Sequence, residues 1–207
     1  QPAARAEPRL VTCETAGVRV AAPNAQDRAN ACAGAGDALR FFAAAGLPRT
    51  EPIAIEVVPR LPEAAAATAV GCYVHSRRRI FVLGYAVLAR RARWMQVPID
   101  RKVHRSIVVH EVAHHLTACN DGWSDMSWQG REYVASVAMF AAMDPVLRER
   151  VLRAMPGTGF ATVGHITPLS LAFDPEGFAA DAYRHYLKPG NGDAFLRSVV
   201  EGHALTE

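Results

Sequence analysis

The sequence lacks a long apolar run without charges. Its longest stretch without Asp, Glu, Lys or Arg spans residues 154–173, and two prolines and three glycines interrupt it. Because a membrane-spanning helix needs about 20 consecutive apolar residues, we expect no membrane span in this chain.

Lysine is scarce. Only Lys102 and Lys188 are lysines, so arginine supplies the other 21 of the 23 basic residues, and the formal net charge is +3. The arginines cluster only at residues 77–79 and 90–93 and are otherwise spread along the chain. A nucleic-acid-binding surface needs basic residues concentrated on one face, so we expect no nucleic-acid partner.

Large apolar side chains are also few, because 38 of the 207 residues are alanine while the apolar total is 50%. Charged residues make up 21% of the chain, which fits neither a disordered segment nor a coiled coil. We therefore expect a soluble globular chain with one domain or two small ones, rich in helix and with a core of small residues.

The four cysteines include no C-x-x-C pair, which argues against a cysteine zinc site and against a thioredoxin-type motif. Three disulfide pairings are possible. We favour Cys13 with Cys32 and Cys72 with Cys119, because each bond would link neighbouring elements, and reduced thiols are the alternative. The chain starts at Gln rather than Met, and residues 1–8 resemble the start of a mature form after removal of a signal peptide. We therefore expect a secreted or periplasmic location, where disulfides persist.

The N-terminal half carries short β-branched segments and one helical pattern. Asn24 is a suitable N-cap for a helix that ends near Gly46. The expected strands lie within Leu10 to Ala21, Ile53 to Val58, Val70 to His75 and Arg79 to Leu83.

The C-terminal half has the spacing of helices. The expected helices run from Arg101 to near Cys119, from about Ser127 to Met143, from Pro145 to Met155, from Glu176 to Leu187 and from Asp193 to Glu201. The predicted fold class is α+β, with a small mixed sheet and a helix in the N-terminal half and a helical C-terminal half. We expect a single domain over residues 1–207, made of an extended lead (1–9), a sheet-containing lobe (10–100) and a helical lobe (101–207).

The most informative motif is H-E-x-x-H at residues 110–114, within the expected helix. Two histidines four residues apart lie on the same helix face, so His110 and His114 can bind one metal ion. Glu111 is rotated about 100° from His110, which places its carboxylate beside the ion, where it can accept a proton from water. Glu111 is also the only charged residue between Ile107 and Asn120, an expensive position for an acid without a function.

A catalytic zinc ion usually has three protein ligands and one open position, so a third ligand is needed. If the next helix packs antiparallel on the first, Glu132 near its start can face the metal. Asp125, in the preceding loop, is the alternative third ligand, because its surroundings are similar to the ligand loop of aspzincins. Neither Thr117 nor Asn120 supports an extended, three-histidine motif.

Together these residues resemble the gluzincin branch of the zincin metallopeptidases, and in particular the small bacterial peptidase-MA-like domains. The similarity covers roughly residues 50–202, and only the H-E-x-x-H motif in it is highly specific. The resemblance implies a zincin-like fold with Zn²⁺ held by His110, His114 and Glu132, and with Glu111 as general base in peptide-bond hydrolysis. It also implies that the strand around Arg79 to Leu83 is the sheet edge along which an extended substrate lies.

The expected function is therefore that of a zinc-dependent peptidase acting on a peptide or protein substrate. The alternative is a catalytically weak or inactive zincin-like domain that binds a protein or peptide partner. Tyr183, His165 and His185 are the candidates for stabilising the transition state. The oligomeric state and the substrate specificity stay open.

Overall fold

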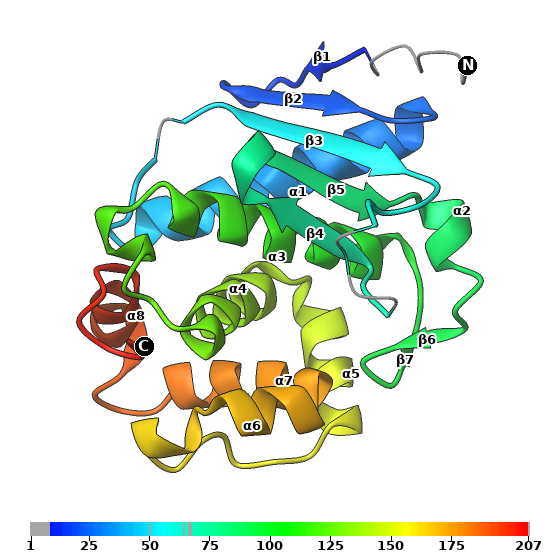
Figure 1. Ribbon diagram of the computed structural model, residues 1–207. Coiled ribbons are helices and arrows are strands. Elements are labelled where there is room, and N and C mark those ends of the chain that lie inside the picture. The colour runs from blue at the N-terminus through cyan, green and yellow to red at the C-terminus, as the bar shows by residue number, and fades with distance from the viewer. Residues whose placement is uncertain (1–8, 50, 64, 66–67, 207) are drawn as a thin grey trace.

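The protein is mixed α and β, with a five-stranded sheet and helix α1 (Ala25–Ala44) in the N-terminal half and a helical C-terminal half (Figure 1). The structure is a computed structural model that describes residues 9–49, 51–63, 65 and 68–206. The expected α+β class with a small mixed sheet is therefore confirmed. Residues 1–8 of the expected N-terminal lead lie outside the described residues.

The sheet has the strand order β1-β2-β3-β5-β4. Strands β2, β3 and β5 are parallel, whereas β1 and β4 run antiparallel to their neighbours β2 and β5. The strands are β1 (Val11–Thr12), β2 (Val18–Ala21), β3 (Ile53–Val58), β4 (Gly71–Val74) and β5 (Arg79–Leu83).

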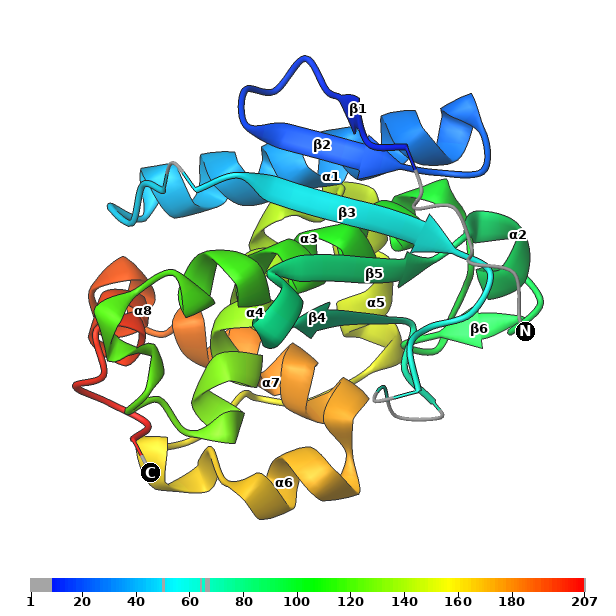
Figure 2. The same ribbon diagram turned by 45° about the horizontal axis from the view of Figure 1, so that its top comes forward.

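Strand β5 is not the edge of the sheet, so that prediction was wrong. It lies between β3 and β4, and β4 is the edge strand next to the helical half (Figure 2). The physical reason is visible in the side chains, because residues 80–83 are four consecutive apolar residues that are all buried. A run buried on both faces is typical of an interior strand. The less buried β4 is better suited to an edge.

Of the two favoured disulfides, only Cys13–Cys32 is present, and it joins the end of β1 to helix α1 (Ala25–Ala44). The predicted bond between Cys72 and Cys119 is wrong, since both are free cysteines.

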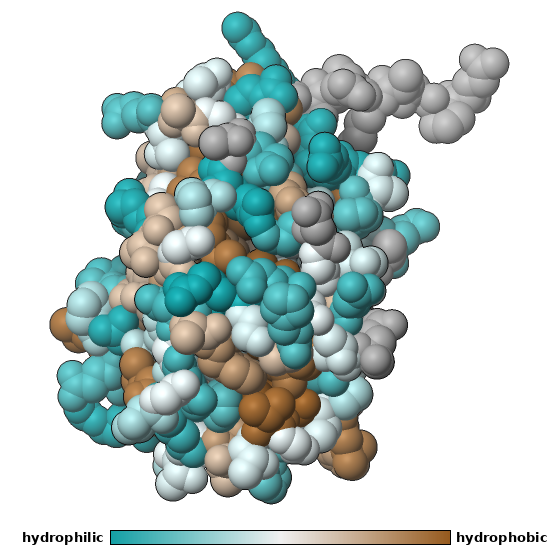
Figure 3. Space-filling view, turned by 90° about the vertical axis from the view of Figure 1, so that its left-hand side faces the viewer, coloured by the Kyte–Doolittle hydropathy of each residue, from teal (hydrophilic) through white to brown (hydrophobic). Residues whose placement is uncertain are grey.

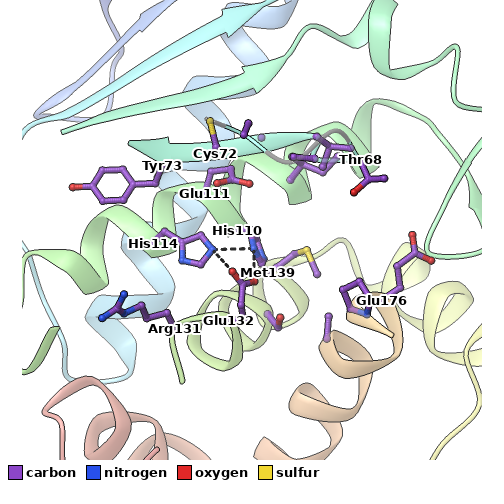
Figure 4. Close-up of a pocket in the computed structure, with 18 of the residues that line it drawn as sticks. Thr68, Cys72, Tyr73, His110, Glu111, His114, Arg131, Glu132, Met139 and Glu176 are labelled. Atoms are coloured by element: carbon purple, nitrogen blue, oxygen red, sulfur yellow. Dashed lines mark hydrogen bonds and ion pairs between the residues drawn. The ribbon is translucent and has the colours of Figure 1, made fainter. Parts of the chain in front are cut away.

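Alternation of side chains along β4 explains why these two thiols do not meet. The Tyr73 ring faces the helices and lies 5.3 Å, centre to centre, from the ring of His115. Cys119 is on that same side, with its Sγ 4.0 Å from His115 Nε2. Cys72, next to Tyr73 in the strand, points to the opposite face of β4 (Figure 4).

Helix α1 supports helix α3 (Arg101–Ala118), which carries the H-E-x-x-H motif. As expected, Asn24 caps α1, accepting a hydrogen bond from the backbone N–H of Asp27 at 2.8 Å. Asp37 of α1 binds Arg105 of α3, with 2.8 Å between Oδ1 and Nη2. Helix α3 thus packs on both α1 and α4 (Trp128–Ala142).

The C-terminal half contains the predicted helices, with ends within two residues of the expected positions. Helix α7 (Pro175–Tyr186) packs on α4, and α8 (Gly192–Val200) contacts both of these helices. The predicted helices here are α4 (Trp128–Ala142), α5 (Pro145–Ala154), α7 (Pro175–Tyr186) and α8 (Gly192–Val200). Short elements that were not predicted are α2 (Tyr85–Leu88), β6 (Arg93–Trp94), β7 (Val97–Pro98), α6 (Pro168–Phe173) and the 3₁₀ turns η1 (His75–Arg77), η2 (Asp121–Trp123) and η3 (Val163–His165).

Apolar side chains also reach the surface, mainly in the helical half. Helix α6 exposes Leu169 and Phe173, which are 65% and 82% accessible. On the face shown in Figure 3 the largest continuous apolar area likewise lies in the lower half. Among the described residues, the helices are all too short or too polar to span a membrane.

Candidate metal centre

The three predicted ligands come together where α3 packs against α4. His110 and His114 lie one turn apart on the same face of α3, and Glu132 lies in the second turn of α4 (Figure 4). Ser127 caps α4 by accepting a hydrogen bond from the backbone N–H of Gly130, which fixes where the helix begins. The start of α4 thereby presents Glu132 to both histidines.

The donor atoms of this cluster form a small triangle. His110 Nε2 lies 3.1 Å from His114 Nε2. Glu132 places Oε2 at 3.4 Å from His110 Nε2 and Oε1 at 3.4 Å from His114 Nε2. A tetrahedral zinc ion with ligand bonds of about 2.0 to 2.1 Å separates its donor atoms by about 3.3 Å. One ligand atom from each of the three residues lies within 4.8 Å of the other two, so the triangle is compact enough for a single ion and has the donor set of a two-histidine, one-glutamate zinc site.

The shifts in pKa favour a charged Glu132 beside a neutral His114. Burial by itself disfavours the charged form of Glu132, but the neighbouring His114 and His110 outweigh it and hold the Glu132 pKa below its usual value. Burial lowers the pKa of His114, so its imidazole is neutral and can offer a lone pair. In His110, burial opposes protonation, yet the hydrogen bond and charge of Glu132 raise the pKa. An anionic carboxylate between two imidazoles is a suitable environment for a cation.

Glu111 lies beside this triangle rather than in it. The residue is only 6% exposed, and its side chain lies beneath strand β4 (Figure 4). Burial raises the pKa of Glu111 to about 7, with the charges of His110 and Glu132 acting in opposite directions. A carboxyl group with a pKa near neutrality can both accept and return a proton, which is what a general acid–base catalyst needs.

A cleft of about 1100 Å³ runs past the cluster, between the edge strand β4 and the helices α4, α6 and α7. His110, Glu111, His114 and Glu132 all line it. The space is large enough for several residues of an extended peptide.

One end of the cleft is aromatic and cationic, which the sequence did not indicate. The ring of Trp123 stacks on His75 with 5.8 Å between the ring centres and an interplanar angle of 12°. The guanidinium carbon of Arg131 lies 4.2 Å from the centre of the Trp123 ring. Arg131 directly precedes Glu132, and that adjacency was the one signal that could have identified it.

The remaining candidates lie elsewhere. Asp125 is exposed in the loop before α4, where its Oδ1 accepts a hydrogen bond from Ser124 at 3.2 Å, and it is not part of the ligand triangle. Tyr183 is buried against Phe140, with 5.3 Å between their ring centres. His185 is hydrogen-bonded to the Tyr133 hydroxyl and His165 to Thr162, both at 2.9 Å and outside the cleft.

Comparison with known proteins gives a family but no activity. The model of a family described as "Family of unknown function (DUF6639)" matches residues 18–207, which is all of the chain from strand β2 onward. No curated protein and no solved structure matches this chain.

Proposed function

The chain belongs to the family of unknown function DUF6639, and we propose that it is a zinc-dependent peptidase with a zincin-like fold of the gluzincin type. The single observation that carries the proposal is the triangle of His110, His114 and Glu132 with the buried Glu111 beside it. The zinc-binding residues are then His110, His114 and Glu132, and the catalytic residue is Glu111.

The order of the elements supports the same fold. Helix α3 runs beneath a mixed sheet, the edge strand β4 borders the cleft, and the next long helix along the chain, α4, supplies the third ligand (Figure 4). A zinc ion bound there would polarise a carbonyl group and lower the pKa of water in its open position.

Glu111 carries the proton transfer in this proposal. Its carboxylate accepts a proton from the attacking water and then donates that proton to the nitrogen of the departing amine. Burial raises the pKa of Glu111 to about 7 without a bound cation. The positive charge of a zinc ion would lower this pKa and so favour the carboxylate that accepts the proton. The carboxylate of Glu111 thus holds the transferred proton next to the ligand triangle.

Strand β4 supplies the surface for the substrate backbone. Within the part of the chain that the structure describes, β4 pairs with β5 on one side only. Its other side borders the cleft, so an extended peptide can add to the sheet there by backbone hydrogen bonds. A peptide or protein substrate is therefore favoured over a small metabolite.

The Cys13–Cys32 bond supports the cellular location in this proposal. Disulfides persist in oxidising compartments, so we place the protein outside the cytoplasm, as a secreted or periplasmic protein.

The test compares wild type with Glu111→Gln after loading both with zinc. We expect about one equivalent of bound zinc in each protein by elemental analysis. We also expect Glu111→Gln to hydrolyse a peptide library about 10²- to 10⁴-fold more slowly, because only the proton acceptor is lost. Zinc-loaded wild type that cleaves no peptide or protein would contradict the peptidase and favour a zincin-like domain that binds its partner without cleaving it.

A further inference from the structure

The two ends of the cleft differ, and the end next to α7 combines apolar walls with one acid, Glu176, and with the side chains of Arg91 and Arg93. Figure 4 shows Met139 between His110 and the Glu176 carboxylate. The apolar side chains that line this end are Met95, Met139, Leu171 and Ala179. A side chain entering from the metal site would therefore meet apolar surface first and the Glu176 carboxylate beyond it.

The negative charge of Glu176 has no cationic partner in the described part of the chain, where its carboxylate forms no ion pair. Arg91 and Arg93 line the same cleft, but their guanidinium groups are engaged elsewhere. Arg91 donates to the carbonyl oxygens of residues 68 and 69, and Arg93 donates to the carbonyl oxygen of Gln96. The charge of Glu176 is thus available to a ligand.

From these contacts we propose that this end of the cleft is a specificity subsite for a lysine or arginine side chain of the substrate, next to the bond that is cleaved. The inference rests on the proposed peptidase function and adds the substrate class to it. The long aliphatic stem of lysine or arginine packs on the two methionines, and the cationic tip binds the Glu176 carboxylate.

Glu176 also forms a hydrogen bond within the protein, and the test must separate the loss of this bond from the loss of substrate recognition. Its Oε1 accepts a hydrogen bond from the backbone N–H of Met95 at 3.1 Å. Met95 and Gln96 form the turn of the β6–β7 hairpin with φ values of 47° and 62°, a conformation that costs energy in residues other than glycine. Glutamine at position 176 keeps an oxygen acceptor for Met95 and removes only the charge.

The experiment measures binding rather than turnover, using short peptide hydroxamates that chelate the metal. The ligands differ only in the side chain next to the hydroxamate, which is lysine, arginine, norleucine or glutamate. We expect zinc-loaded wild type to bind the lysine and arginine ligands about 10-fold more tightly than the norleucine ligand. In Glu176→Gln this preference should fall to about twofold or less, while the affinity for the norleucine ligand stays the same.

Glu149→Gln is the matched control, because Glu149 is a 70% exposed acid on α5 that forms an ion pair with Arg153. It should keep the full preference for lysine and arginine. Equal affinities for the lysine and norleucine ligands in wild type would overturn the subsite, and so would a preference that Glu176→Gln leaves unchanged. Tighter binding of the glutamate ligand would also overturn it, because this end would then recognise an acidic side chain through Arg91 and Arg93. A chain that shows the lysine preference but cleaves no peptide would contradict the peptidase function alone.

Discussion

Gly71 determines where the carboxylate of Glu111 can lie. A Cβ atom at position 71 would stand 2.6 Å from Glu111 Cγ and 2.7 Å from its Oε1, too close for either atom to stay in place. Because the Glu111 side chain is flexible, we expect Gly71→Ala to displace the carboxylate without unfolding the protein. The rate of peptide hydrolysis should fall about 10²-fold, since the general base is misplaced, while zinc content stays at the wild-type level.

Gly164→Ala is the control for this substitution. The nearest atom to a Cβ at position 164 is Thr162 Oγ1 at 3.7 Å, an ordinary contact, and Gly164 lies outside the cleft. Steady-state kinetics and elemental analysis on both variants check the prediction. Wild-type kinetics in Gly71→Ala would show that Glu111 does not depend on this close approach.

The residues of the candidate site differ in how far the sequence could identify them. His110, Glu111 and His114 follow from fixed offsets on one helix, because helical geometry alone brings them together. Glu132 needed the further assumption that α4 packs against α3, which the structure shows. Gly71 and Glu176 come from other elements and depend on how the chain folds back on itself, so spacing along the sequence carries no signal for them.

At the scale of elements, a glycine in α1 sets how closely the metal-binding helix approaches. A Cβ at Gly34 would stand 2.9 Å from Val108 Cβ and 3.0 Å from the Arg105 carbonyl oxygen, both on α3. Gly34→Ala should therefore push α3 away from α1 and lower the free energy of unfolding by about 1 to 3 kcal/mol. Denaturant unfolding monitored by circular dichroism measures the change.

Gly36 provides a comparison within the same helix. A Cβ there meets only the ends of side chains, Thr15 Oγ1 at 3.1 Å and Arg40 Nη1 at 3.4 Å, which can move aside. Alanine is favoured over glycine inside a helix by roughly 0.5 to 1 kcal/mol, so Gly36→Ala should leave stability unchanged or raise it slightly. If both variants lost the same stability, the loss would not be due to the α1–α3 contact.

The elements that the sequence predicted well are the long, regular ones. Helices such as α3 and α4 repeat their apolar positions over several turns and carry clear caps, so their ends were predicted within about two residues. The edge strand was assigned wrongly. The apolar run at residues 80–83 already favoured an interior position for β5, but which strand then forms the edge depends on long-range pairing. Short elements such as α6 contain too few residues for a periodic pattern.

At the scale of the whole molecule, the site lies where two parts of the fold meet. Helix α3 is held by α1 and the sheet, whereas the start of α4 is held by the C-terminal segment, because Ser127 Oγ donates to the Leu205 carbonyl oxygen at 2.6 Å. An ion bound by His110, His114 and Glu132 would therefore join α3 to α4 directly.

Zinc should accordingly stabilise the folded chain. A ligand that binds only the folded state at 1,000 times its Kd adds about 4 kcal/mol to the free energy of unfolding. For a chain of this size that corresponds to a rise in Tm of about 10 °C, measured by thermal unfolding with zinc and after chelation. Glu132→Ala should lose at least about a third of this rise, because a zinc affinity that falls by at least about 10-fold leaves at most about 2.7 kcal/mol of the added stability at the same zinc concentration.

The variant Asp125→Ala tests, by the same measurement of Tm, whether Glu132 or Asp125 is the third ligand. Asp125 is an exposed loop residue outside the triangle, so this variant should keep the full zinc-dependent rise in Tm. Both variants remove one carboxylate, so the loss of negative charge cannot by itself explain a difference between them. A rise that survives Glu132→Ala and disappears in Asp125→Ala would contradict the ligand set of His110, His114 and Glu132, and would require the loop before α4 to reach the two histidines.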